Sequence, residues 1–156
     1  MEPSSLLDAL AGVVGSAHLL TDDESRTFYS TDVYRQADIL ALAVAQPGTV
    51  DELQELVRVC ARHGAPMVAR GGGASYTDGY LPTQPNTVLF DTSRLDRIDI
   101  DAQDMTVTVE PGVTWAALYQ ALSARDLRTP FWGPISGIAA TVGGGMSPYA
   151  VNSGSG

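Results

Sequence analysis

The stretch from Pro66 to Tyr76 constrains the possible folds of this chain more than any other part of the sequence. It begins as a short apolar segment, typical of a buried strand, and runs directly into Arg70 and three consecutive glycines. Glycine loses more conformational freedom on folding than any other residue, so such a run suits positive φ angles or the close approach of another group. Successive peptide N–H groups in a turn of this kind can converge on an anion such as a phosphate. A plain glycine turn is the alternative, because a glycine-rich loop alone has little specificity.

The residues before this stretch predict a βαβ unit that leads into the glycines. The segment from Asp38 to Ala45 is apolar and continuous, which indicates a strand buried on both faces. Thr49 and Glu52 have the spacing of a capping box, and Gly64 is a typical stop for the helix that follows. One stripe of this helix is apolar and consists of Leu53, Leu56, Val57 and Cys60. The two strands of the unit are expected to be parallel.

Two short helices are predicted before this unit. Apolar residues at helical spacing predict one from Ser4 to Val14, capped by Ser4 or Ser5. The second is predicted from Thr21 to Tyr29, with Thr21 as its first residue. Residues 1–37 are therefore expected to form a helical lead-in to a domain that spans residues 38–156.

A strand, a hairpin and a helix are predicted after the glycines. Residues 87–91 are typical of a buried strand, and residues 97–101 and 105–110 alternate apolar and polar side chains around a turn, as a hairpin does. Trp115 to Leu122 has the spacing of an amphipathic helix with Thr114 as its cap. The aspartates in this region fit a solvated strand face better than a metal site; they are Asp91, Asp96, Asp99, Asp101 and Asp104.

Composition excludes several classes of function. The net charge of −9, with nine arginines and no lysine, disfavours nucleic-acid binding and excludes a Walker-type phosphate loop and Schiff-base chemistry. Cys60 is the one cysteine, so no internal disulfide or cysteine metal cluster can form, and we expect a core residue rather than a nucleophile. No metal site is expected. The sequence has no apolar run long enough to span a membrane and no basic secretory start, which predicts a cytoplasmic protein.

A second glycine-rich element runs from Thr129 to Met146. With the first element, it gives the chain a resemblance to the FAD-binding domain of the vanillyl-alcohol oxidase / p-cresol methylhydroxylase flavoprotein family. The resemblance covers about three quarters of the chain. Its specificity comes from the order and spacing of four short segments, which are residues 45–53, 70–75, 109–113 and 140–145.

This resemblance implies an α+β, p-cresol methylhydroxylase (PCMH)-type fold, with a small parallel βαβ subdomain followed by the start of a mainly antiparallel one. It implies that the first loop binds the FAD pyrophosphate through backbone N–H groups and that the second element lines the dinucleotide. The implied cofactor-binding residues are Arg70, Gly71, Gly72, Gly73, Ala74, Ser75, Ser136, Gly137, Thr141, Gly143 and Gly144. Relatives with covalent FAD often carry a histidine where this chain has Ala74, and the second element has no cysteine, so noncovalent FAD is expected.

The implied function is that of the FAD-binding portion of a flavin-dependent oxidoreductase, which transfers a hydride from a hydroxy acid or alcohol to FAD. The pattern from Ser136 to Gly144 points to 2-hydroxy acids, while alcohols and sugars stay open. Members of the family continue into a substrate domain, so this chain is expected to be incomplete at its C-terminus and inactive by itself, and its catalytic residues cannot be named. The alternative is a truncated, non-catalytic remnant that binds FAD weakly or not at all.

Overall fold

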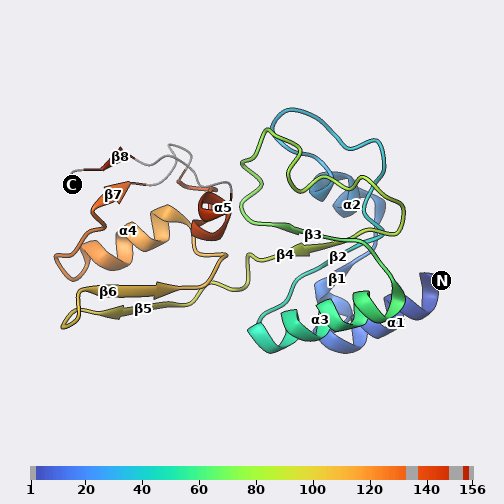
Figure 1. Cartoon of the computed structure of the whole chain (residues 1–156), viewed down its shortest axis with the longest axis horizontal. Coiled ribbons are helices and arrows are strands. Elements are labelled where there is room, and N and C mark those ends of the chain that lie inside the picture. The colour runs from blue at the N-terminus through green and yellow to red at the C-terminus, as the bar shows by residue number, and fades with distance from the viewer. Residues whose placement is uncertain (1–2, 133–136, 148–152, 155–156) are drawn as a thin grey trace.

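A computed structural model of the chain describes residues 3–132, 137–147 and 153–154, and its elements fall into two halves (Figure 1). The first half contains α1 (Pro3–Val14), a 3-10 turn (Ser16–His18), β1 (Leu19–Leu20), α2 (Asp23–Tyr29), β2 (Ala43–Ala45), α3 (Val50–His63), β3 (Met67–Arg70) and β4 (Val88–Asp91). The second contains β5 (Ile98–Asp101), β6 (Thr106–Val109), α4 (Trp115–Ser123), β7 (Phe131–Trp132), α5 (Val142–Met146) and β8 (Ser153–Gly154).

The first half is built on a four-stranded sheet with the strand order β1-β2-β4-β3. Strands β2, β4 and β3 are parallel, and β1 pairs with β2 in the antiparallel direction. The predicted βαβ unit is therefore confirmed, with β4 lying between its two strands. Strand β2 is shorter than predicted because the preceding backbone bonds to side chains: Ala41 donates its N–H to Ser30 Oγ and accepts from Arg26 Nε.

Both faces of β2 and β4 are buried, as the sequence predicts. The prediction of a buried strand before Arg70 is wrong for the edge strand β3, where Met67 and Ala69 are exposed. Helices α1 and α3 pack on one face, where Leu6 and Leu10 meet Leu56 and Cys60 over the alternate strand residues Ala43, Ala45, Val88 and Phe90. On the other face Ala41, Val44 and Leu89 pack with partly buried side chains from neighbouring segments. The predicted helix α1 thus contributes to this core, and residues 3–37 also supply β1, a strand that the sequence did not predict, to this sheet.

The ends of the helices agree only in part with the sequence patterns. Helix α1 begins at Pro3, so the predicted caps Ser4 and Ser5 lie inside the helix; proline suits the first turn because its missing N–H has no partner there. The cap of α2 is Asp22 rather than Thr21, since its carboxylate accepts the N–H of Ser25 at 2.8 Å.

Helix α3 confirms most of its predicted pattern. Thr49 Oγ1 accepts the N–H of Glu52, and Gly64 ends the helix with φ of 62°. Glu52 Oε2 reaches the N–H of Gly48, one residue before the position that a capping box uses. The prediction for Val57 is wrong, because its side chain is 41% exposed and Val59 is buried in its place.

The second half is a hairpin covered by α4. Strands β5 and β6 pair in the antiparallel direction, and α4 is capped by Thr114 as predicted. Val113, Trp115, Leu118 and Leu122 pack against the apolar face of the hairpin, while its aspartates face solvent. Asp91 is the exception: it is buried, and its carboxylate accepts from Tyr29, Gln46 and Ser93, so it does not lie on a solvated face.

Candidate functional site

The glycine loop begins at the carboxyl end of β3. Three carbonyl groups in and next to it are bound from inside the protein: that of Arg70 accepts from Thr92, that of Gly73 lies 3.1 Å from the Tyr80 hydroxyl, and that of Ser75 accepts from Val33. Within the described residues, no backbone N–H from Gly71 to Tyr76 donates to another protein group. Because backbone N–H groups in folded proteins are almost always paired, this row of donors is open to solvent or to a ligand.

Arg70 lies beneath this loop with its charge buried. The residue is only 9% exposed, and its guanidinium carbon lies 5.1, 4.8 and 5.3 Å from the ring centroids of Phe28, Tyr29 and Tyr80. Among the described residues, no carboxylate forms an ion pair with it, and its Nε has no hydrogen-bond partner. The three rings stabilise the cation through their negative faces. The positive charge of Arg70 is therefore fixed behind the N–H groups of the loop.

Gly73 must be a glycine for two reasons that involve this arginine. Its φ is 67°, in the left-handed region that most side chains avoid. A Cβ at this position would also overlap the guanidinium of Arg70. The glycine thus allows the buried cation to lie directly against the loop backbone.

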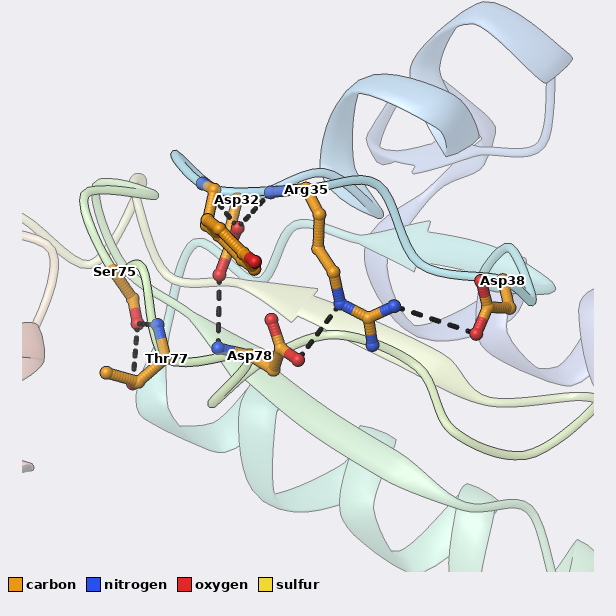
Figure 2. A network of polar contacts seen from close by, with 7 residues as sticks. Asp32, Arg35, Asp38, Ser75, Thr77 and Asp78 are labelled. Atoms are coloured by element: carbon orange, nitrogen blue, oxygen red, sulfur yellow. Dashed lines mark hydrogen bonds and ion pairs between the residues drawn. The ribbon is translucent and has the colours of Figure 1, made fainter.

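The segment from Asp32 to Asp38 supports the same loop from its other side (Figure 2). The Asp32 carboxylate accepts the N–H groups of Tyr34, Arg35 and Asp78, and these bonds, that of Arg35 above all, hold its pKa below the ordinary aspartate value. Arg35 in turn pairs with Asp78 at 3.0 Å and with Asp38 at 3.6 Å. Ser75 Oγ, at the end of the loop, accepts the N–H of Thr77.

The structure brings the two glycine-rich elements together. A Cβ on Gly71 would overlap Thr141 Oγ1, and the same Cβ would lie 3.7 Å from the Cα of Gly144. A Cβ on Gly72 would overlap the carbonyl of Ala139. These glycines are therefore required where the backbones of the two halves approach each other most closely. The sequence analysis named Gly71, Gly72, Thr141 and Gly144 as cofactor-binding residues, but it predicted neither this contact nor the part of Ala139 in it.

The predicted residues of the second element have structural partners of their own. Thr141 is buried and caps α5 by accepting the N–H of Gly144 at 3.1 Å. The N–H of Gly143 donates to Pro111, and the carbonyl of Gly137 accepts from Ala116. Ser136 lies outside the described residues. The N–H groups of Gly143 and Gly144 are therefore already bound within the second half.

Several residues around the site were missed by the sequence analysis. Phe28, Tyr29 and Tyr80 surround the arginine, and Asp32 and Asp78 fasten the loop. One signal was available for Asp32, because an aspartate shortly after a helix commonly bonds the backbone N–H groups that follow it. Nothing local marks the aromatic residues, which lie in different segments of the chain. No group of metal-ligating side chains occurs among the described residues.

Comparison with known proteins shows the family of this chain. A family model described as an FAD binding domain matches residues 41–156. The glycolate oxidase subunit GlcD of Bacillus subtilis (strain 168) is 30% identical over 140 residues, which cover 90% of this chain and 30% of that protein. The quinone-dependent D-lactate dehydrogenase of Escherichia coli (strain K12) is 30% identical over 122 residues, or 76% of this chain and 21% of that protein. The chain thus spans less than a third of the length of either relative.

Solved structures show the same fold. Alkyldihydroxyacetonephosphate synthase superposes with a TM-score of 0.82 at 18% identity, covering 90% of this chain and 30% of that one. p-Cresol methylhydroxylase with substrate bound superposes with a TM-score of 0.75 at 22% identity, covering 88% of this chain and 27% of that one. No helix in the described part of the chain is long and apolar enough to cross a membrane. The chain belongs to the FAD-binding domain family and has the PCMH-type fold of vanillyl-alcohol oxidase flavoproteins.

Proposed function

We propose that this chain binds FAD noncovalently, with the FAD diphosphate on the backbone N–H groups of Gly71, Gly72, Gly73, Ala74 and Ser75. The proposal rests on the hydrogen-bonding pattern of the loop backbone. The carbonyl groups of Arg70, Gly73 and Ser75 are bound within the protein, and the N–H groups from Gly71 to Ser75 have no acceptor among the described residues. A diphosphate supplies several anionic oxygens that such N–H groups can bind together.

Electrostatics supports the same assignment. The chain carries a net charge of −9, which repels anions at long range. Arg70 opposes this locally, because its charge is buried behind the loop and unpaired with any carboxylate among the described residues. A buried charge is screened far less than an exposed one, so its attraction for a bound diphosphate outweighs that of a surface arginine.

The second element is proposed as the wall along the dinucleotide. Gly144 lies next to the first loop, since its Cα would be 3.7 Å from a Cβ on Gly71, and Gly144 is exposed. We assign Ser136, Gly137, Thr141, Gly143 and Gly144 to this wall on family resemblance. Gly137, Thr141, Gly143 and Gly144 have hydrogen-bond partners within the second half, which support a fixed shape for this wall.

The side chains at position 74 and of Cys60 support noncovalent binding. Ala74 offers no nucleophile, and it packs partly buried against the core of the second half. Cys60 is fully buried in the core of the first half, where burial raises the pKa of its thiol to about 11. A protonated, inaccessible thiol cannot attach a flavin.

In the complete protein, we propose oxidation of a 2-hydroxy acid. Two relatives are named for glycolate and D-lactate, which are both 2-hydroxy acids. Bound flavin would accept the hydride and supply the redox chemistry. This chain would contribute binding and orientation of the cofactor through the loop, with residues 38–156 as its cofactor domain and the cytoplasm as its location.

Hydrogen exchange with and without FAD tests the binding site directly. The N–H groups of residues 71–76 have no acceptor in the described part of the chain, so they should exchange rapidly in the free protein. FAD should slow their exchange and leave a peptide from α3 unchanged. After gel filtration the chain should keep flavin absorbance, and acid precipitation should release it. Bound FAD with unchanged exchange at residues 71–76 would overturn the site, and no bound FAD would overturn the function.

A matched pair of variants at position 75 distinguishes the effect of side-chain charge on FAD binding from the effect of side-chain size. Ser75→Asp places a carboxylate in the loop, and Ser75→Asn places a neutral group of the same size there. Both keep an oxygen acceptor for the N–H of Thr77. We expect Ser75→Asp to weaken FAD binding by at least about tenfold, as repulsion between close charges of equal sign requires. Ser75→Asn should bind nearly as the unmodified chain does; equal affinity of the two variants would place the diphosphate elsewhere.

A further inference from the structure

We propose that the segment from Thr31 to Arg35, which precedes the residues matched by the family model, positions the glycine loop, with Asp32 as the central positioning residue. The family match begins at residue 41, so nothing in it assigns a role to this segment. The inference rests on the proposed function for its ligand. Its structural part, that Asp32 holds the loop, stands without FAD.

The Asp32 carboxylate joins two segments that are far apart in the sequence. Oδ1 accepts the N–H groups of Tyr34 and Arg35 at 2.7 and 2.8 Å and so shapes its own turn. Oδ2 accepts the N–H of Asp78 at 3.1 Å, just beyond the glycine loop (Figure 2). Asp32 is only 8% exposed, so water offers these N–H groups little competition. One side chain therefore fixes both its own turn and the far end of the loop.

Backbone contacts extend this support along the loop. The N–H of Val33 donates to the carbonyl of Ser75 at 3.0 Å. The Tyr80 hydroxyl lies between the carbonyls of Thr31 and Gly73, at 3.2 and 3.1 Å. Both contacts turn loop carbonyls toward the segment from Thr31 to Arg35. Because the N–H groups of a turn face away from carbonyls that are held in this manner, the segment keeps the donors available for an anion.

Arg35 contributes less than Asp32. Its ion pair with Asp78 is short, at 3.0 Å, but each side chain is 42% exposed. Exposed ion pairs contribute little because water and salt screen them. Hydrogen bonds from backbone N–H groups to a buried carboxylate are stronger and directional. The carboxylate of Asp32 is thus the main link, and the ion pair is an accessory one.

The test uses Asp32→Asn and limited digestion with trypsin. The amide keeps one oxygen for Tyr34 and Arg35 but turns an NH₂ group toward the N–H of Asp78. Trypsin must extract Arg70 from its aromatic surroundings to cut the bond before Gly71, so cleavage there reports opening of the loop. We expect cleavage at this bond to become about tenfold faster, as the loss of a hydrogen bond to a charged group predicts. Cleavage after the exposed Arg125 should stay unchanged.

A control and a ligand readout complete the experiment. Asp23→Asn makes the same chemical change at a side chain that is 92% exposed and pairs only with Arg26 in the described structure. It should alter neither cleavage after Arg70 nor FAD affinity. Asp32→Asn should lower FAD affinity by about tenfold, matching its effect on cleavage. Arg35→Gln, which leaves the Asp32 turn in place, should speed cleavage about twofold to fivefold.

The outcomes separate the two proposals. Faster cleavage in Asp32→Asn, in a chain that binds no FAD, would support the positioning role and overturn the proposed function. Unchanged cleavage and unchanged affinity would overturn the positioning role and leave FAD binding intact. Should circular dichroism show that Asp32→Asn does not fold, Arg35→Gln decides: cleavage after Arg70 at the unmodified rate would overturn the positioning role.

Discussion

Tyr29 shows how one side chain can hold several segments together behind the glycine loop. Its ring stacks on Arg70, and its hydroxyl donates to Asp91 Oδ2 at 2.7 Å and accepts from Gln46 at 3.2 Å. Burial, followed by the neighbouring carboxylate of Asp91, raises the pKa of Tyr29 to about 12. The ring therefore stays neutral over the whole physiological range and keeps its contact with the buried cation.

This raised pKa predicts a loss of stability in alkali. Between pH 10, the ordinary value, and about 12, folded Tyr29 keeps its proton and the unfolded chain loses it. The unfolded state then binds fewer protons, so the free energy of unfolding falls as pH rises through this window. Urea denaturation from pH 8 upward should show a steeper decline for the unmodified chain than for Tyr29→Phe. Parallel pH curves for the two proteins would show that Tyr29 ionises equally in both states.

At the scale of helices and strands, the sequence patterns correctly predicted features that are formed by residues close together in the chain. The cap at Thr49, the stop at Gly64 and the β5–β6 hairpin are set by residues within a few positions of one another. The predictions were wrong where the contacting residues come from distant parts of the sequence. Val57 fits the apolar stripe of α3, but its side chain is exposed rather than packed on the core. Strand β2 is shorter than predicted because the preceding residue Ala41 bonds to the side chains of Arg26 and Ser30.

Two glycine-to-alanine changes should have opposite effects on the free energy of unfolding. Gly64 ends α3 with φ of 62°, and a Cβ there meets nothing within 4 Å. Gly64→Ala should therefore destabilise the protein by about 1 kcal/mol through backbone strain alone. Gly12, in the middle of α1, also has open space but ordinary helical φ, so Gly12→Ala should stabilise by about 0.5–1 kcal/mol. Chemical denaturation measures both, and effects of the same sign would contradict this account.

Across the whole molecule, the candidate site depends on contacts that no local pattern contains. The run of glycines identified the loop, family resemblance assigned the FAD pyrophosphate to it, and composition excluded a cysteine metal cluster and a lysine-based phosphate site. The support of the loop comes from Asp32, which precedes Asp78 by 46 positions, and from the packing of Gly72 on Ala139 in the second half. Such pairs become neighbours only once the chain has folded. A single sequence therefore identifies the glycine loop but not the distant residues that hold it in place.

The contact between the two halves gives the final prediction. The Ala139 carbonyl occupies the place that a Cβ on Gly72 would take, so Gly72→Ala must push the loop away from the second element. Gly79→Ala is the matched control, because its Cβ would lie 3.8 and 3.9 Å from Thr77 and Ser75, at ordinary contact distance. Under the proposed function, FAD affinity should fall at least about tenfold in Gly72→Ala and stay unchanged in Gly79→Ala.

Calorimetric titration with FAD measures both affinities, and circular dichroism checks that the elements of each half persist. The expected loss in Gly72→Ala has a geometric cause, since close packing transmits the displacement of one backbone to its neighbour rather than absorbing it. Full affinity in Gly72→Ala, in a chain that binds FAD when unmodified, would mean that the first loop binds the cofactor without the second half. The second glycine-rich element would then serve the fold of its own half rather than the cofactor.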